Sequence, residues 1–235
     1  MSFIEKVASI DIRLQRDAWD FVTDRANEIE ANWQRRFEAN PRLYNGKVLL
    51  TRDIALHAAP GSARLEGACF IADYKTFLAW HDLGQPGDVK NLFALAALRT
   101  ADGAFLLGEM AAWTANAGRI YFPGGTPDLE DLDGDTLDLD GSALRELTEE
   151  TGLTARDVMP SPGWAVVFDG GLIACMKELR TPLSAAELVA RISRFLAQEK
   201  NPEFARLVPV FGAADISAPM PAFMQIYLRR AFDTD

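Results

Sequence analysis

The feature that most constrains this chain is the stretch RELTEETGL at residues 145–153. In a helix, 3.6 residues per turn bring Glu146, Glu149 and Glu150 onto one face. Like charges at this spacing destabilise a helix by a few tenths of a kcal/mol per pair. Either the face is solvated and relieved by bases such as Arg145, or the acids are gathered to bind a divalent cation. Hard ions such as Mg²⁺ prefer carboxylate oxygens, water and substrate phosphates.

Signals at both ends of this stretch predict the helix. Asp140 or Ser142 can cap a helix that starts near Gly141, and Gly152 stands where a left-handed terminator is expected. The preceding YFPGG, residues 121–125, closes a predicted strand. The acids therefore follow a strand and a glycine turn.

Composition limits the class of protein and its partners. The 235 residues are 49% hydrophobic and 25% charged, as in ordinary globular proteins. Neither a signal peptide nor a membrane span is expected, because the first thirty residues carry acids throughout and no run reaches eighteen apolar residues. The net charge of −10 opposes binding of long nucleic acids.

The cysteines and histidines lack metal-ligand spacing, so ordinary structural roles are expected for all four: Cys69, Cys175, His57 and His81. Two isolated thiols favour a cytoplasmic, reducing location.

The first ninety residues are predicted to form an N-terminal accessory region, 1–90. Residues 18–39 have apolar positions at steps of three and four, which indicate an amphipathic helix. Its Trp stripe is predicted to pack internally, and it is also a candidate homodimer surface or lid. Two β-rich runs, 47–58 and 63–74, are separated by Pro60-Gly61, and the loop 84–87 marks the expected boundary.

Residues 91–235 are predicted to form the main domain. Turn pairs at Asp102-Gly103 and Gly170-Gly171 indicate two hairpins. Further elements are expected as strands at 118–125 and 205–210 and as helices at 184–199 and 221–232. The predicted fold class is α/β (α+β), a mixed β-sheet with helices on both sides.

The acidic stretch resembles the Nudix box, the signature of hydrolases that cleave a nucleoside diphosphate linked to another moiety. The second half of that pattern is present without a mismatch as Arg145, Glu146, Leu147, Glu149, Glu150, Gly152 and Leu153. The resemblance covers roughly residues 91–235. It implies a Nudix-like α/β/α sandwich and a pyrophosphohydrolase acting on a phosphorus-containing anhydride.

The first half of the box departs from the family pattern. Asp131 and Leu137 stand at the positions where its glutamate is expected, and the span from Gly125 to Arg145 is about six residues longer than usual. Asp131, Asp135 or Asp138 is expected to replace that glutamate, within an exposed acidic loop. A calcium loop is disfavoured, because its last ligand position holds a leucine, Leu147.

The resemblance also implies a metal site and a mechanism. Glu149 and Glu150 are expected to bind Mg²⁺ or Mn²⁺, with Glu146 as a further ligand or proton acceptor. Arg145 is expected to orient a glutamate through an ion pair, and the backbone carbonyl near Gly125 to complete the metal shell. The general base of this family can also come from a later loop, where Glu199 and Glu203 are candidates and surface roles are the alternative.

Substrate contacts are less specified by the sequence. Four aromatic residues at predicted strand ends could stack on a base or belong to the core: Trp113, Tyr121, Phe122 and Trp164. Arg119 could bind a phosphate or be a surface charge. The leading class is a small nucleotide-derived substrate, a nucleotide sugar or ADP-ribose. The alternatives are coenzyme A or its acyl esters, and a non-catalytic module that binds a nucleotide metabolite.

Overall fold

The computed structural model describes residues 2–58 and 62–233. The chain divides into two compact units. The first comprises residues 1–8, 93–125 and 139–235, and the second comprises residues 9–92 and 126–138. The division after residue 92 lies near the expected boundary, but residues 1–8 join the first unit and residues 126–138 join the second.

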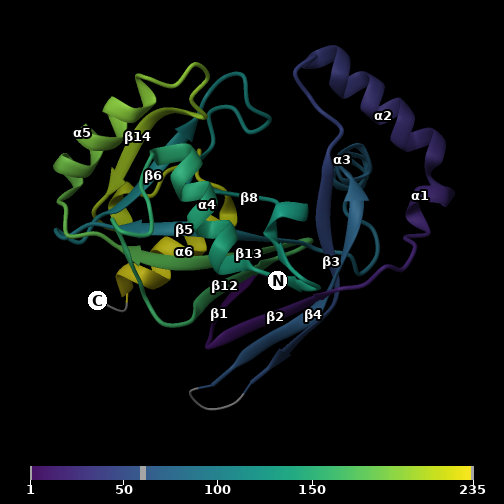
Figure 1. The fold of residues 1–235 in the computed structure, drawn as a ribbon, viewed down its shortest axis with the longest axis horizontal. Coiled ribbons are helices and arrows are strands. Elements are labelled where there is room, and N and C mark those ends of the chain that lie inside the picture. Colours follow the sequence, from purple (N-terminus) through teal and green to yellow (C-terminus); the bar gives the residue numbers. More distant parts are fainter. Residues whose placement is uncertain (1, 59–61, 234–235) are drawn as a thin grey trace. The chain divides into compact units, whose positions relative to one another are not determined.

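The first unit is built on a nine-stranded sheet in which β1-β12-β13-β5-β6-β14 lie in order (Figure 1). Three short strands pair at its side: β11 with β13, β7 with β6, and β8 with β5. The strands are β1 Phe3–Val7, β5 Asn91–Arg99, β6 Phe105–Met110, β7 Ile120–Tyr121, β8 Gly124–Gly125, β11 Met159–Pro160, β12 Trp164–Asp169, β13 Leu172–Arg180 and β14 Phe204–Val210.

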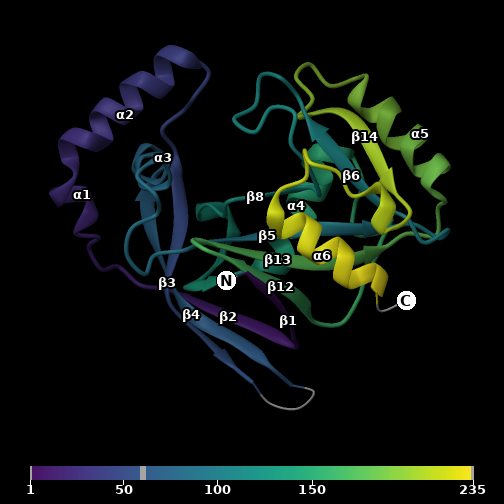
Figure 2. The same cartoon turned by 180° about the vertical axis from the view of Figure 1, so that it is seen from behind.

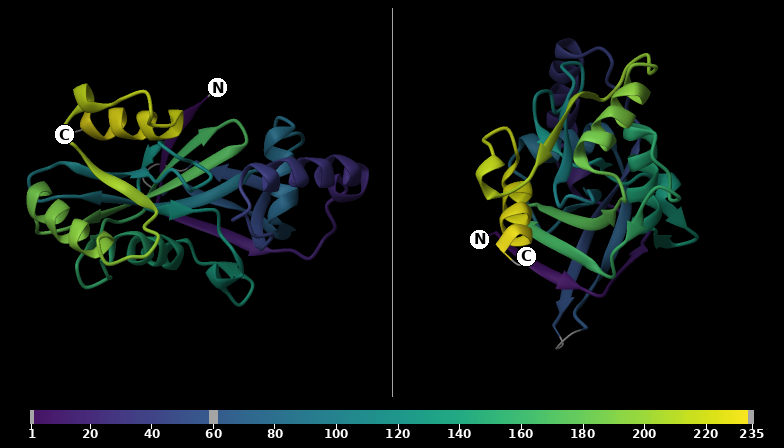
Figure 3. Two further views of the ribbon diagram at one scale, coloured as in Figure 1. Left: turned by 90° about the horizontal axis from the view of Figure 1, so that it is seen from above. Right: turned by 90° about the vertical axis from the view of Figure 1, so that its left-hand side faces the viewer.

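Helices cover both faces of this sheet. One face carries α4 (Leu139–Thr151) and α5 (Ala185–Leu196), and α6 (Ala222–Asp233) covers the other (Figures 1 and 2). The view from above shows the three layers directly (Figure 3). A short 3-10 helix, η2 (Ala213–Asp215), precedes α6. The α+β fold class and the helix-sheet-helix arrangement expected from the sequence are confirmed in this unit.

Each face of the sheet buries its own apolar cluster. Under α6, the rings of Phe105, Phe122 and Tyr227 pack together with centroids 5.6 to 5.7 Å apart, and Tyr227 meets both phenylalanines edge to face. Under α4 and α5, a second cluster contains Leu98, Leu147, Leu179, Leu188 and Ile192. The alternation of side chains along β5 and β13 supplies both clusters, as expected for strands buried on two faces.

The predicted hairpins and helices of this unit are present. β5 and β6 flank the turn at Asp102-Gly103, where Gly103 has a φ of 87°. β12 and β13 flank Gly170, whose φ is 63°. Positive φ values of this kind favour glycine. The sequence reasoning missed β1, which pairs with β12 from Phe3↔Phe168 to Val7↔Trp164.

The second unit holds a five-stranded mixed sheet in the order β3-β4-β2-β10-β9. β2 runs parallel to β4, and the other pairs are antiparallel. The elements are β2 Ser9–Leu14, α1 Phe21–Asp24, α2 Ala26–Ala39, β3 Lys47–His57, β4 Arg64–Asp73, α3 Tyr74–Asp82, η1 Leu129–Asp131, β9 Leu132–Asp133 and β10 Thr136–Leu137. The predicted Pro60-Gly61 turn lies outside the described residues.

The segment between the two halves of the box exposes Glu130, Asp133, Asp135 and Asp138, as expected, but the expectation that it is a loop is wrong. Residues 126–138 form η1 and the strands β9 and β10, and β10 pairs with β2 through Thr136↔Arg13. The segment is held further by Leu14 N–H donating to Asp135 O at 2.8 Å and Leu49 N–H donating to Pro127 O at 2.7 Å. Strand pairing, which the local composition does not reveal, makes the insertion part of the second unit.

The helix expected over residues 18–39 is interrupted at Arg25, so that α1 and α2 are separate. Trp19 packs on the core of the second unit, with its ring centroid 5.4 Å from that of Phe70. The ring centroid of Trp33 instead lies 6.0 Å from that of Phe37, which is 39% exposed. The aromatic stripe is therefore only partly internal.

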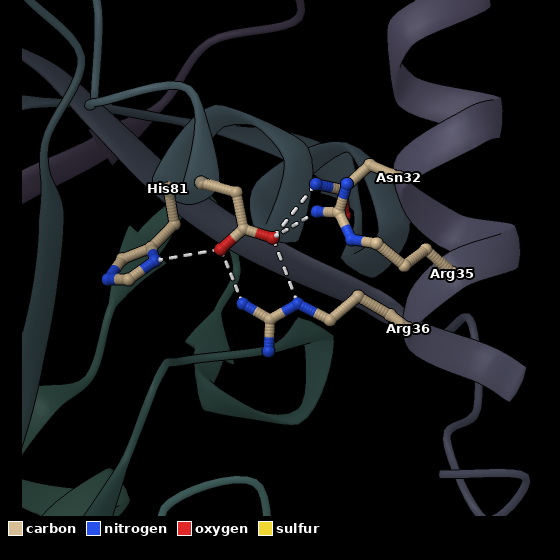
Figure 4. A network of polar contacts seen from close by, with 5 residues as sticks. Asn32, Arg35, Arg36 and His81 are labelled. Carbon is tan, nitrogen blue, oxygen red and sulfur yellow. Dashed lines mark hydrogen bonds and ion pairs between the residues drawn. The ribbon is translucent and has the colours of Figure 1, made fainter. Parts of the chain in front are cut away.

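Polar contacts join α2 to α3 at Asp82. Its carboxylate accepts hydrogen bonds from Asn32 Nδ2 at 2.8 Å and from Arg36 Nε at 2.9 Å, and also from Arg36 Nη2. Arg35 and His81 complete the group of side chains around it (Figure 4). The hydrogen bond from Arg36 is the main reason that the pKa of Asp82 lies well below its ordinary value.

Within residues 2–58 and 62–233, every helix is too short or too polar to cross a membrane.

Candidate functional site

Helix α4 carries the acids, and its apolar side fixes its position on the sheet. Ala143 and Leu147 are fully buried, and Leu147 packs with Leu153 in the core under α4 and α5. The helix begins at Leu139, two residues before the expected start, and Gly152 follows its end with a φ of 69°. Because this side of α4 is buried, the residues beside it on the helix surface face β8.

Glu150 is the buried acid of this helix, with 5% of its surface exposed. It accepts a hydrogen bond from the backbone N–H of Gly124, while its Oε2 has no hydrogen-bond partner among the described residues. Burial first, and then the charges of Glu146 and Glu203, raise its pKa well above the ordinary value. A buried acceptor without a partner is costly unless a proton or a cation supplies one.

Glu146 lies against the glycines of β8. A Cβ at Gly125 would stand 2.7 Å from Oε1 of Glu146, closer than real Cβ contacts allow. At Gly124 a Cβ would stand 2.4 Å from the carbonyl oxygen of Ala94. The missing side chain of Gly125 thus lets the Glu146 carboxylate approach β8, and that of Gly124 lets β8 approach β5.

Arg145 pairs with two of the acids. Its Nη2 lies 3.7 Å from Oε1 of Glu146, and its Nη1 lies 3.4 Å from Oε1 of Glu149. Glu149 is the outermost acid, with 58% of its side chain exposed. One guanidinium therefore bridges two carboxylates. The resemblance implied an ion pair of this kind for Arg145.

A fourth acid, Glu203, joins this group from the start of β14. Its backbone carbonyl accepts a hydrogen bond from Ala111 N–H at 2.7 Å, which fixes this segment beside β6. Burial and the charge of Glu149 raise the pKa of Glu203, even though the residue keeps solvent contact. Both candidate bases are exposed, but only Glu203 is among the charges that act on Glu150; Glu199 lies beyond the end of α5.

Tyr121 lies beside the same acids but within the core. It is 9% exposed and hydrogen-bonds to Asn116. Burial, and then the charges of Glu150, Glu203 and Glu146, raise the pKa of its hydroxyl. Its phenol is therefore neutral, and it forms one wall of the acidic site.

The remaining substrate candidates are more scattered. Phe122 is fully buried under α6, and Trp164 is 7% exposed with the ammonium of Lys177 4.8 Å from its ring. The indole of Trp113 donates a hydrogen bond to Pro202 O at 3.2 Å, next to Glu203. Arg119 is exposed, in the segment between β6 and β7. Burial excludes base stacking by Phe122 in this conformation.

The acids expected to replace the first glutamate of the box all lie in the second unit. Asp131 is buried, and its Oδ2 accepts the backbone N–H of Asp128 at 2.9 Å. Asp135 is exposed, 3.9 Å from Arg16, and Asp138 is also exposed. Asp131 thus has a structural role in a capping box.

The carboxylates of the first unit suit a divalent cation. Glu146, Glu149, Glu150 and Glu203 offer only hard oxygen donors, and the buried Oε2 of Glu150 lacks a partner. In the described residues, no three Asp, Glu, His or Cys side chains are yet close enough to hold one ion together. Binding of one ion by three of these carboxylates would therefore require some of their side chains to move.

Comparison with known proteins gives matches among solved structures only. No protein-family model matches the sequence, and no curated protein is significantly similar to it. A Nudix hydrolase from M. smegmatis, RenU, is 18% identical with a TM-score of 0.37, over 61% of this chain and 83% of that one. The MutT protein from Methanosarcina mazei Go1 is 21% identical with a TM-score of 0.41, over 62% and 94%. NrtR from Shewanella oneidensis is 16% identical with a TM-score of 0.41, over 62% of each chain.

At these identities and TM-scores, neither an activity nor a substrate transfers from those proteins to this chain. Nudix hydrolases, the family that residues 145–153 resemble, are nevertheless among the solved structures to which this chain is similar.

Proposed function

We propose that the protein is a divalent-metal-dependent hydrolase that cleaves the pyrophosphate bond of a small nucleoside diphosphate derivative, of the nucleotide sugar or ADP-ribose class. The observation that carries the proposal is the carboxylate of Glu150, buried among like charges with one oxygen lacking a hydrogen-bond partner. A chain gains no stability from such an arrangement by itself. It becomes favourable when a cation neutralises the cluster.

Glu146, Glu149 and Glu150 would hold Mg²⁺ or Mn²⁺, with Glu203 close by. Such an ion, when bound, would neutralise the negative charge on the non-bridging phosphate oxygens and lower the pKa of the water bound to it. Arg145 holds Glu146 and Glu149 in place through its two ion pairs. The Gly124 N–H fixes the orientation of the Glu150 carboxylate.

Glu203 is the best-placed proton acceptor for the attacking water. It comes from a different element than α4, so it can approach substrate from another side. Its raised pKa, caused by burial and by Glu149, makes it a stronger base than an ordinary glutamate.

The test is an assay of the purified chain with Mg²⁺ or Mn²⁺ against ADP-ribose, UDP-glucose, GDP-mannose, NADH, diadenosine polyphosphates and coenzyme A, with products identified by mass. We expect a nucleoside monophosphate product and a loss of about 100-fold or more in kcat for Glu150→Gln. Glu38→Gln, which removes one exposed negative charge from α2, is the matched control and should keep full activity. Full activity of Glu150→Gln would contradict the proposal.

A second candidate is a non-catalytic module that binds a nucleotide metabolite. It is favoured by one observation: Asp131, Asp135 and Asp138 belong to the second unit and not to the unit that holds the other box residues. Tight binding of one compound from the panel, without turnover under either metal, would support this alternative.

We also propose a cytoplasmic location. The two cysteines, Cys69 and Cys175, are buried free thiols, which suits a reducing compartment. Burial raises the pKa of Cys69 to about 11, so this thiol is unreactive in the folded chain.

A further inference from the structure

The first unit contains a cavity on the sheet face opposite to the acidic helix. It has a volume of about 730 Å³ and lies between α6 and the strands β1, β12, β13 and β5. Figures 2 and 3 show α6 on this face, with α4 on the other. Cavities that bind small molecules typically measure roughly 300 to 1,000 Å³. None of the acids of α4 lines this cavity.

Four bases from four different elements converge on this cavity. They are Lys6 of β1, Arg99 of β5, Arg180 of β13 and Arg230 of α6. Side-chain alternation explains the convergence on the strands. Ile4, Ala97 and Met176 pack in the core under α6, and residues an even number of positions further along a strand share that face. Lys6 and Arg99 lie two positions further on, and Arg180 lies four.

The acids of the cavity do not balance these bases. Glu5 and Glu178 line it, which leaves two positive charges in excess. The carboxylate of Glu178 accepts hydrogen bonds from Arg180 Nε at 2.8 Å and from Ser161 Oγ at 3.2 Å, and its Oε2 lies 4.0 Å from Arg99 Nη1. It therefore offsets part of the charge of both arginines. The chain as a whole carries a net charge of −10, so a local excess of positive charge is unusual for it.

The wall between the bases is apolar and partly aromatic. Met176 and Tyr227 are buried members of the core under α6, and both line the cavity. The guanidinium of Arg99 is itself held over the ring of Phe105, 5.1 Å from its centroid. A packed arginine of this kind loses little freedom when it binds an anion.

We propose that this cavity is a second ligand site, which binds a small organic anion with an apolar or aromatic body and a phosphate or carboxylate head. The bases hold the head, and the apolar wall holds the body. The site is separate from the acidic helix and does not depend on the proposed hydrolase activity.

The test is a titration of the full chain with the fluorescent anion 8-anilinonaphthalene-1-sulfonate, followed by competition. We expect saturable one-site binding, which Arg180→Gln and Arg230→Gln each weaken about tenfold, because each removes one charge-assisted contact. Arg229→Gln is the matched control: this exposed neighbour on α6 does not line the cavity, and its substitution should leave the affinity unchanged. Should either variant unfold, Lys6→Gln at an exposed position of β1 replaces it.

Competition experiments show which anionic head group the cavity prefers and whether the ligand needs an apolar body. Displacement by hexyl phosphate or by hexanoate supports the site and shows which head it prefers. Inorganic phosphate should compete at least about tenfold more weakly than hexyl phosphate, since it lacks the apolar part. Unchanged probe binding in all the cavity variants, binding that does not saturate, or equal competition by inorganic phosphate would overturn the proposal. Glu150→Gln should bind the probe as the unmodified chain does, whatever the outcome of the hydrolase assay.

Discussion

Gly125 has no side chain, and the carboxylate of Glu146 fills the space that one would take. Gly125→Ala should therefore displace this carboxylate without straining the backbone, since Gly125 is not among the glycines with positive φ. A displacement of about 1 Å in a catalytic group can cost about 100-fold in rate, so we expect kcat to fall by that order while the fold persists. Gly212→Ala, where a Cβ meets nothing within 4 Å, is the matched control. Normal activity of Gly125→Ala would show that the position of Glu146 does not matter.

The two candidate bases can be separated by substitution. Glu203→Gln should lower kcat by about 100-fold or more, because general-base catalysis contributes that much. Glu199→Gln should have no effect, since this residue lies beyond the end of α5 and, unlike Glu203, is not among the charges that act on Glu150. Both rates are measured with saturating metal and substrate, and equal losses in the two variants would leave Glu203 without a special role.

At the residue scale, the sequence predicted which acids share a helix face but not which of them is buried. Glu146, Glu149 and Glu150 are equivalent in a helical projection, yet their exposure differs because β8 covers only one edge of α4. For Tyr121 the sequence left a substrate contact and a core position open, and the structure buries it. Its neighbours in space come from β14 and α4, which are distant in the chain.

Among the elements, α5 has the clearest start signal. Ser184 Oγ and Glu187 form a reciprocal capping box, with Ser184 N–H donating to Glu187 Oε2 at 2.9 Å. Ser184→Ala should lower the free energy of unfolding by about 1 kcal/mol, as expected for a lost N-cap. Urea denaturation measures the change. Ser193→Ala, at an exposed position of the same helix, serves as the control and should be neutral or slightly stabilising.

The insertion in the box is an ordered element with its own cap. Asp131→Ala removes the acceptor of the Asp128 N–H from a buried position and should cost about 1 to 2 kcal/mol of stability. Asp133→Ala, at an exposed position of β9, should cost little. If Asp131→Ala abolished hydrolysis without lowering the urea midpoint, Asp131 would instead belong to the catalytic site.

Elements with local signals were predicted, and elements defined by distant pairing were not. The Asp102-Gly103 and Gly170 turns fixed two hairpins, and periodicity fixed α5 and α6. By contrast, β1 pairs with β12 more than 150 residues away, and β10 has only two residues. The alternation of Ile10, Ile12 and Leu14 in β2 was a usable signal that the sequence reasoning did not apply.

Across the whole molecule, the chain passes between the two units at four points, after residues 8, 92, 125 and 138. The pattern of residues along the sequence changes near residue 90, so a single boundary was predicted there. The other passages are set by strand pairing, in β1 for the first unit and in β10 for the second. The second unit is thus not separable as an N-terminal fragment without losing β9 and β10.

Acid should weaken the second unit through Asp82. The Arg36 hydrogen bond lowers the pKa of this carboxyl in the folded chain. A group of this kind contributes stability above its unfolded pKa, about 4, and loses it as the pH falls further toward the folded value. We expect the urea midpoint to drop on acidification below about pH 4. Asp82→Asn should flatten this drop, and parallel curves for the two chains would contradict the assignment.

Binding of Mn²⁺ tests the central claim most directly, because it requires neither a substrate nor turnover. Electron paramagnetic resonance of free Mn²⁺ in a titration gives the affinity for the unmodified chain, Glu150→Gln and the exposed control Glu38→Gln. We expect the unmodified chain and Glu38→Gln to bind alike, and Glu150→Gln to bind at least about tenfold more weakly, since a neutral amide replaces a carboxylate ligand. Equal Mn²⁺ affinity in Glu150→Gln and the unmodified chain would contradict a metal site on α4.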